Sequence, residues 1–215
     1  MVNILGKENT VLNQYMAEMR DVEVQHDKLR FRKNLERAGE ISAYEISKKL
    51  EWIKKEVTTP LGTSKVSVLK QQPVIATILR AGLPFHQGML NFFDKAENAF
   101  ISAYRKHHKD GTFNVQVEYL SCPDLTDKIL ILCDPMLATG ASIELVYKAL
   151  MRNGRPTYTH IASVIASTQG VDYIKKNLPN NISIWCCAID DELTAQAYIV
   201  PGLGDAGDLA YGNKI

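Results

Sequence analysis

Residues 129–142 read ILILCDPMLATGAS, and the fold can be worked out from them. The first five residues, 129–133, are apolar without alternation, which predicts a short strand buried on both faces of a parallel sheet. Asp134 follows, and Pro135 ends the strand because proline cannot donate to a ladder. The next residues, 138–142, are small, so they allow the backbone to approach a ligand closely.

A helix is predicted directly after this loop, with Ser142 as its N-cap and Glu144 in its first turn. This order of elements points backbone N–H groups and a helix N-terminus at a ligand, most simply a phosphate. Asp134 could accept hydrogen bonds from sugar hydroxyls. The loop lacks both the lysine of a Walker A motif and a GxGxxG pattern. From spacing alone, an ordinary strand-to-helix turn explains these residues equally well.

The same arrangement recurs upstream. Residues 74–79 form a second apolar run, which predicts a buried strand, and Arg80 stands at its carboxyl end. A helix is expected to begin near Pro84 or Phe85. Ligands of open α/β sheets bind at the carboxyl ends of strands. Arg80 is therefore a candidate for contacting a diphosphate, although an arginine here could also be a structural ion-pair partner.

The remaining patterns alternate between helices and strands. We expect a helical region over about 10–55 with a break at Gly39, and two short strands around a turn within 57–69. Later strands and helices are expected at 98–104, 113–119, 161–167, 171–178 and 182–189. Short links between these elements predict a parallel sheet covered on both faces.

Composition excludes several classes of protein. The chain has 215 residues and a net charge of +1, so no global basic field would recruit nucleic acid. No apolar stretch reaches membrane-spanning length, and the N-terminus lacks the apolar core of a signal peptide. The four cysteines form no Cys-x-x-Cys pattern, so we expect reduced thiols in a cytoplasmic protein rather than a metal site. The cysteines are Cys122, Cys133, Cys186 and Cys187.

Three further segments carry charge or glycine. The basic residues between Arg30 and Arg37 are interpreted as a solvated face, with an anionic regulator as the less favoured alternative. The acids at 190–192 are interpreted as a solvated turn or helix start. Residues 198–208 are rich in glycine but also apolar, so we expect them to pack as a hood over a ligand.

Residues 134–142 closely resemble the loop that binds 5-phosphoribosyl 1-diphosphate (PRPP) in type I phosphoribosyltransferases. The form DPMLATG is similar to the uracil phosphoribosyltransferase branch, and so are ILRAGL at 78–83 and YIVPGLGDAGD at 198–208. The resemblance covers roughly residues 20–212. It implies an α/β fold of type I phosphoribosyltransferase kind, with a parallel sheet flanked by helices. A single domain over 1–215 is expected.

Within this domain the residue patterns predict an N-terminal helical region at about 10–55, a β-hairpin arm at about 100–120 and the hood at about 190–212. The resemblance implies transfer of the phosphoribosyl group from PRPP to uracil, giving UMP and diphosphate in pyrimidine salvage. Asp134 and Arg105 are the implied catalytic residues. The implied PRPP-binding residues are Arg80, Arg105, Asp134, Pro135, Met136, Leu137, Ala138, Thr139, Gly140, Ala141, Ser142 and Asp205. The implied uracil-binding residues are Ile199, Gly204, Asp205 and Ala206.

Further expectations concern cofactors and partners. Mg²⁺ is expected to be held mainly through PRPP and water, which suits a chain without a metal cluster. The expected partners are uracil, PRPP and a second copy of the chain in a homodimer or larger oligomer, with a GTP-type effector as a further candidate. The chain departs from the family pattern at three positions. Many members have glycine at Ala141 and Ala197, and a basic residue near Leu209.

Two other functions fit parts of the sequence. A regulatory protein with this fold could bind nucleotide and RNA without catalysis, but it would need a basic face that the near-neutral chain hardly supplies. A purine phosphoribosyltransferase is the second alternative, and the hood at 198–208 argues against it.

Overall fold

The computed structural model describes the backbone of residues 1–107 and 113–213 and the side chains of 1–103 and 117–213. Eight strands form one sheet in the order β1-β10-β9-β7-β4-β5-β6, with β8 beside β9. Neighbouring strands are parallel except for the antiparallel pair β5 and β6. The strands are β1 (Val2–Ile4), β4 (Val74–Leu79), β5 (Glu97–His107), β6 (Phe113–Ser121), β7 (Ile129–Cys133), β8 (Met136–Leu137), β9 (Tyr158–Ser167) and β10 (Ile182–Asp190). The predicted α/β fold with a mainly parallel sheet is confirmed.

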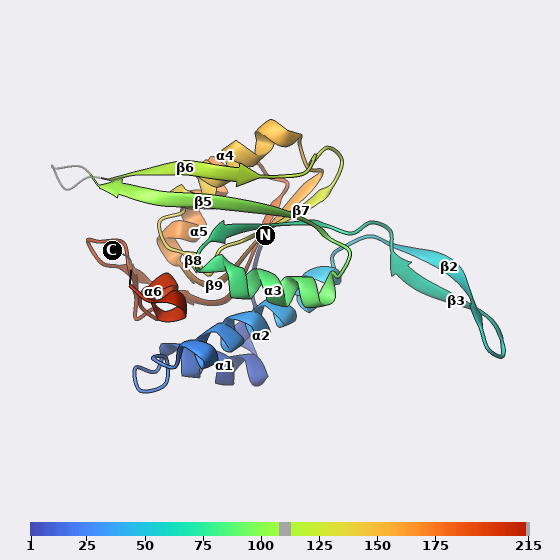
Figure 1. Ribbon diagram of the computed structural model, residues 1–215, viewed down its shortest axis with the longest axis horizontal. Coiled ribbons are helices and arrows are strands. Elements are labelled where there is room, and N and C mark those ends of the chain that lie inside the picture. Colours follow the sequence, from blue (N-terminus) through green and yellow to red (C-terminus); the bar gives the residue numbers. More distant parts are fainter. Residues whose placement is uncertain (108–112, 214–215) are drawn as a thin grey trace.

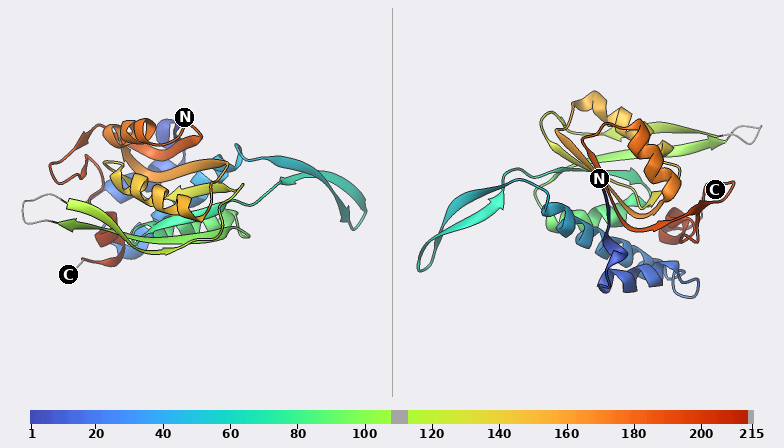
Figure 2. Two further views of the ribbon diagram at one scale, coloured as in Figure 1. Left: turned by 90° about the horizontal axis from the view of Figure 1, so that it is seen from above. Right: turned by 180° about the vertical axis from the view of Figure 1, so that it is seen from behind.

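Helices cover both faces of the sheet (Figures 1 and 2). One face packs against α1 (Val11–Arg20), α2 (Lys28–Ser47) and α3 (Gly82–Phe92), and the other against α4 (Ala141–Leu150) and α5 (Thr168–Asn177). Two separate clusters of buried apolar side chains result, one on each side of the sheet.

Strand β7 shows why its sequence has no alternation. Leu130 and Leu132 point into the core beneath α4, whereas Ile131 and Cys133 point into the core beneath α2 and α3. All four side chains are fully buried, so both faces of the strand must be apolar.

The predicted break at Gly39 is wrong. Helix α2 runs without interruption from Lys28 to Ser47, and Gly39 is buried in its middle. A Cβ at Gly39 would lie 2.2 Å from the carbonyl oxygen of Phe85, and one at Gly88 would lie 1.9 Å from that of Glu36. The two glycines therefore allow α2 and α3 to pack backbone against backbone. The prediction of a helical region as far as about residue 55 is also wrong at its end, because β2 (Trp52–Thr59) begins before residue 55.

Two hairpins extend from the molecule. The first pairs β2 with β3 (Gly62–Leu69) around the predicted turn, and it projects away from the rest of the chain (Figure 1). The second is the predicted arm of β5 and β6, whose residues 108–112 lie outside the described residues. Within the described residues, no helix is long and apolar enough to cross a membrane.

The C-terminal segment folds back over the sheet. After β10 it contains β11 (Glu192–Leu193), β12 (Ile199–Val200) and α6 (Ala206–Tyr211). Ile199 and Leu203 are buried in the same core as α2, which confirms that this glycine-rich segment is packed.

Candidate active site

Four neighbouring strands end at one edge of the sheet. β4 pairs with β7, β7 with β9, and β9 with β10, all in parallel. Arg80 directly follows β4, Asp134 directly follows β7, Ser167 ends β9 and Asp190 ends β10. The carboxyl ends of parallel strands are the usual place for a ligand, so this edge is the candidate site.

Asp134 and Pro135 extend β7 without forming part of it. The amide of Asp134 donates to the carbonyl of Ala162 at 3.0 Å, and Pro135 accepts from two amides of β9. A carboxylate oxygen of Asp134 accepts from the amide of Met136 at 3.3 Å. Met136 and Leu137 then form β8 beside β9, a pairing that the sequence pattern did not predict.

The loop after β8 is fixed by β9 and α5. The hydroxyl of Ser167 donates to the carbonyl of Ala138 at 2.6 Å and accepts from the amide of Gly170 at 2.8 Å. A Cβ at Gly170 would lie 2.2 Å from the same carbonyl oxygen, so only glycine fits there. The position of Ala138 is thus set by residues about 30 positions downstream.

Helix α4 begins two residues earlier than the predicted N-cap implies. Gly140, with φ 82°, is its N-cap, and no side chain caps it among the described residues. The prediction of Ser142 as N-cap is therefore wrong, because the glycine in left-handed conformation turns the chain into the helix before Ser142 is reached. Ala141 lies in the first helical turn, so alanine is compatible with the backbone here. The amide of Ala141 faces the hydroxyl of Thr139 at 3.4 Å.

Glu144 lies in the first turn of α4, as predicted. Its carboxylate accepts from Lys148 at 2.7 Å and from the hydroxyl of Tyr173 at 2.6 Å. These bonds, that of Lys148 first, hold the pKa of Glu144 below its ordinary value. The negative charge of Glu144, next to the loop, is therefore already compensated by Lys148 and by the hydroxyl of Tyr173.

Arg80 connects the sheet edge to the C-terminal helix. It follows a cis peptide bond after Leu79. Its Nη2 donates to the carboxylate of Asp208 at 3.1 Å and to the carbonyl of Gly212 at 3.2 Å. Its Nε is buried without a hydrogen-bond partner among the described residues. Arg105 lies in β5, and its side chain is outside the described part of the chain.

The C-terminal segment brings the remaining predicted residues to the same edge. Asp205 is the N-cap of α6 and accepts from the amides of Gly207 and Asp208 at 2.8 and 3.1 Å. Gly204 has φ 88°, which favours glycine. Ile199 and Ala206 are 4% and 2% exposed, so their side chains belong to the core.

Comparison with known proteins identifies the family. A family model described as uracil phosphoribosyltransferase matches residues 7–213. A uracil phosphoribosyltransferase of Porphyromonas gingivalis is 58% identical over 211 residues, covering 98% of each chain. Another, of Methanothermobacter thermautotrophicus, is 40% identical over 86% of this chain and 85% of that one. The chain belongs to the uracil phosphoribosyltransferase family.

Solved structures agree with this fold. A protein of Aquifex aeolicus superposes with a TM-score of 0.87 at 28% identity, covering all of both chains. A hypoxanthine phosphoribosyltransferase of Staphylococcus aureus superposes with a TM-score of 0.50 at 12% identity over 87% of this chain and 84% of that one. The second comparison supports the phosphoribosyltransferase fold and nothing more.

The prediction of a solvated acid at position 190 is wrong for this uracil phosphoribosyltransferase family member. Asp190 is 8% exposed rather than solvated, and it forms an ion pair with Arg20 at 2.7 Å. Burial would raise the pKa of Asp190, but Arg20 and the amide of Gly202 together hold it below its ordinary value. The available signal was its place directly after an apolar strand, the same place that Asp134 occupies.

The basic residues of α2 are engaged within the chain. Arg30 pairs with Glu18, and Lys33 with Glu36. Arg32 donates to the carbonyl of Ala210 at 2.7 Å. The fourth residue, Arg37, donates to Asn34 and lies over the ring of Tyr15. The face is therefore more engaged than the predicted solvated face, and an anionic regulator would have to compete with these contacts.

The structure also bears on metals and thiols. In the described ranges, no group of three His, Cys, Asp or Glu side chains could hold a metal ion by itself. The four cysteines are free, and burial raises the pKa of Cys186 and Cys187 to about 12. Such thiols are poor nucleophiles at neutral pH, so they take no part in the candidate site.

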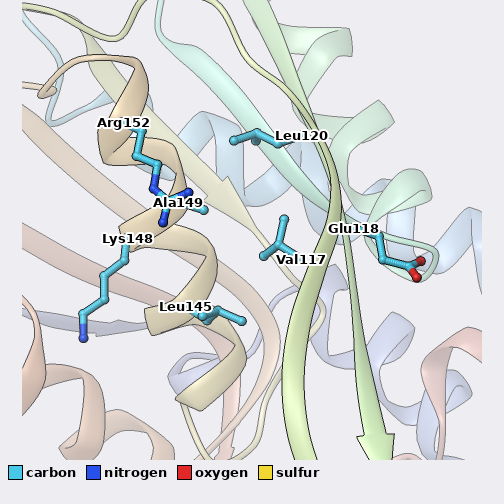
Figure 3. A pocket seen from close by; sticks show the side chains of 7 residues that line it. All are labelled: Val117, Glu118, Leu120, Leu145, Lys148, Ala149 and Arg152. Atoms are coloured by element: carbon cyan, nitrogen blue, oxygen red, sulfur yellow. The ribbon is translucent and has the colours of Figure 1, made fainter.

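A cavity of about 560 Å³ lies elsewhere, between α4 and β6. Val117 and Leu120 point from β6 toward the helix, whereas Glu118 points away from it (Figure 3). None of the predicted site residues lines this cavity. The candidate site is the open edge formed by the strand ends and the C-terminal segment.

Proposed function

We propose that this edge transfers the 5-phosphoribosyl group from PRPP to uracil, giving UMP and diphosphate, a step of pyrimidine salvage. The observation that carries the proposal is the meeting of three segments. Arg80, the loop 134–142 and the C-terminal segment 199–208 come from distant parts of the sequence and reach one edge of the sheet. These are the three segments in which the chain resembles the family. We also propose that the chain acts as one domain, because both termini pack onto this sheet.

The loop 138–142 would hold the 5′-phosphate. The first amides of a helix have no partner within the helix, and α4 has no side-chain cap among the described residues. A phosphate at this end would also be stabilised by the helix dipole. The hydroxyls of Thr139 and Ser142 would add donors. Ser167 and Gly170 would keep the loop in place before substrate arrives.

Asp134 would hold the ribose. It lies between the phosphate loop and β4, so its carboxylate could accept from the ribose hydroxyls. The C1 atom gains positive character as diphosphate leaves, and a fixed carboxylate beside it would offset that charge. Asp134 therefore acts electrostatically in this mechanism, without forming a covalent bond.

Arg80 and Arg105 would bind the diphosphate. Charge-assisted bonds from arginine suit this ligand because the guanidinium can donate two parallel bonds. Mg²⁺ would supply further neutralisation of the diphosphate, held mainly through PRPP and water. The residues fit this role, because Asp134 and Asp205 supply carboxylate oxygens at this edge, the hard donors that Mg²⁺ prefers.

The backbone of residues 199–206 would select uracil. The side chains of this segment are mostly apolar or absent, and none is Asn or Gln, so peptide N–H and C=O groups are left to read the base. Uracil presents an acceptor, a donor and an acceptor along O2, N3–H and O4. Cytosine reverses the last two, and a peptide backbone cannot rotate to repair the mismatch. Sites of this kind reject the wrong analogue by ~10⁴-fold or more.

The test is a panel of bases with Mg-PRPP, following release of diphosphate. We expect uracil and 5-fluorouracil to react and cytosine to show a kcat/KM at least about a thousandfold lower. Hypoxanthine should be inert. Cytosine within tenfold of uracil would overturn the backbone readout, and turnover of purines alone would favour the purine alternative. RNA binding that weakens steeply with salt would favour the regulatory alternative.

Partners follow from the same proposal. We propose a cytoplasmic homodimer or larger homo-oligomer, and the projecting β2–β3 hairpin is the surface that a second copy of the chain would cover. Any GTP-type effector would need a site other than the basic residues of α2, which are already engaged.

A further inference from the structure

An ion pair joins the first long helix to the last core strand. Arg20 is the final residue of α1, and Asp190 is the final residue of β10. The pair is bidentate, with Nη1 to Oδ2 at 2.7 Å and Nη2 to Oδ1 at 2.8 Å. The side chain of Asp190 is 7% exposed and that of Arg20 is 27% exposed. Two parallel charge-assisted bonds in partial burial fix orientation as well as distance.

Both members of the pair also bind one residue of the C-terminal segment. Nη1 of Arg20 donates to the carbonyl of Gly202 at 2.9 Å, and Oδ2 of Asp190 accepts from the amide of Gly202 at 2.8 Å. Gly202 has φ 62°, and a Cβ there would lie 2.0 Å from the carbonyl oxygen of Ile199. The ion pair thus holds both polar backbone groups of a tight glycine turn.

This turn lies within the segment proposed to read the base. Ile199 precedes it, and Gly204 to Ala206 follow it directly. Gln25, which is buried, donates to the carbonyl of Arg20 at 3.1 Å. A Cβ at Gly204 would lie 3.8 Å from the side-chain oxygen of Gln25. Gln25, in the connection between α1 and α2, therefore lies close to the backbone of Gly204.

We propose that Arg20 and Asp190 are positioning residues for the base, because they set the backbone at Gly202 and through it the peptide groups that contact uracil. The inference rests on the proposed function of residues 199–206. It assigns no contact with substrate to either side chain. Their effect is transmitted through one glycine, so it should fall on the base and leave PRPP largely unaffected.

The test measures KM for uracil and for PRPP separately in Arg20→Lys and Asp190→Asn. Lysine keeps the positive charge but cannot donate two parallel hydrogen bonds as the guanidinium does, so it can satisfy only part of the network. We expect KM for uracil to rise about tenfold or more in both variants, with KM for PRPP within threefold of wild type. Discrimination between uracil and cytosine should fall, because the N–H and C=O groups of a looser turn are held in a less fixed orientation.

A matched control exists in the same helix. Glu18 and Arg30 form a second bidentate pair, with bonds of 2.7 and 2.8 Å, and it joins α1 to α2. Among the described residues, neither side chain forms a hydrogen bond with the C-terminal segment. Arg30→Lys and Glu18→Gln should leave both KM values and base discrimination unchanged.

The outcomes separate the two proposals. If wild type does not use uracil, the proposed function itself fails. If wild type uses uracil and the Arg20→Lys variant keeps the wild-type KM for uracil, the positioning role is overturned. A parallel rise in both KM values with a lowered melting temperature would also overturn it, since that is the signature of a merely structural pair. Should Asp190→Asn fail to fold, the charge-conserving Arg20→Lys variant decides.

Discussion

Asp134 is the residue on which the proposed chemistry depends most. We expect Asp134→Asn to lower kcat by about 100-fold, the usual effect of losing one preorganised electrostatic contact. The melting temperature should change little, because asparagine keeps an oxygen that can accept from the amide of Met136. Steady-state kinetics and thermal unfolding measure both. A variant with near-full turnover would show that the acid only terminates the strand.

Ala197 has a backbone conformation that suits glycine. Its φ is 63°, a left-handed value that costs an alanine roughly 1–2 kcal/mol. Glycine costs about 0.5–1 kcal/mol more in chain entropy. Ala197→Gly should therefore raise the free energy of unfolding by about 0.5–1 kcal/mol in a urea titration.

Ala141→Gly serves as the comparison, since Ala141 is helical. This change should lower the free energy of unfolding by about 0.5–1 kcal/mol. The same sign for both substitutions would contradict the argument.

His160 should make stability depend on pH. It is 3% exposed, and its Nδ1 lies 2.8 Å from the hydroxyl of Ser183 and 3.1 Å from the indole nitrogen of Trp185. Burial lowers the pKa of His160 to about 4. Between about pH 6.5 and 4 the unfolded chain binds a proton at this histidine and the folded chain does not. The free energy of unfolding therefore decreases as the pH falls through this range.

The expected loss from His160 is about 1.4 kcal/mol by pH 5.5. Other groups also titrate, so the measurement is a difference. Urea unfolding of wild type and His160→Gln at pH 7.5 and 5.5 should show the gap between the two proteins shifting by this amount in favour of the variant at acid pH. Equal pH dependence of the two would contradict a buried neutral histidine.

At the scale of elements, helices α2 and α3 pack closely against each other at Gly39 and Gly88. We expect Gly39→Ala to lower the free energy of unfolding by about 3 kcal/mol, because its Cβ would overlap the backbone of Phe85 and force the helices apart. Leu29→Ala, at an exposed position of α2, is the control and should cost far less. Chemical denaturation measures the free energy of unfolding of both variants. Equal decreases in the two variants would show that the helices can move apart at little cost in free energy.

The sequence predicted those elements whose signal is local. The strands at 74–79 and 129–133 were recognisable because burial on both faces requires a continuous apolar run. Gly39 was misread because its role depends on α3, which lies far from it in sequence. Strands β1 and β8 have three and two residues, so they carry no periodicity and exist through pairing with distant strands.

The site was predictable to the extent that its residues form local motifs. The phosphate loop and the C-terminal segment could be recognised from contiguous residues. The network of Arg20, Asp190 and Gly202 could not, because its members are separated by 170 and 182 positions. Its acid stood in a run of three acids, which is usually solvated.

At the scale of the whole molecule, the β2–β3 hairpin suggests how two copies meet. It forms a sheet of its own, apart from the main sheet. An isolated pair of strands is marginally stable in water. Trp52 is 49% exposed, Ile53 is 46% exposed and Leu61, at the tip, is fully exposed. Apolar side chains on a projecting ribbon are typical of a surface that a partner covers.

We therefore expect light scattering to give at least twice the 24.1 kDa mass of one chain for the wild type. The double variant Ile53→Asp and Leu61→Asp should shift the protein toward a single chain, because a charge buried in an interface without a partner is costly. The folded core should be unaffected, since both side chains lie outside it. Lys54→Gln with Lys65→Gln alters the same hairpin without touching apolar side chains and should keep the wild-type mass. A wild-type mass of 24.1 kDa, or an undiminished mass in the aspartate variant, would contradict a role for this hairpin in assembly.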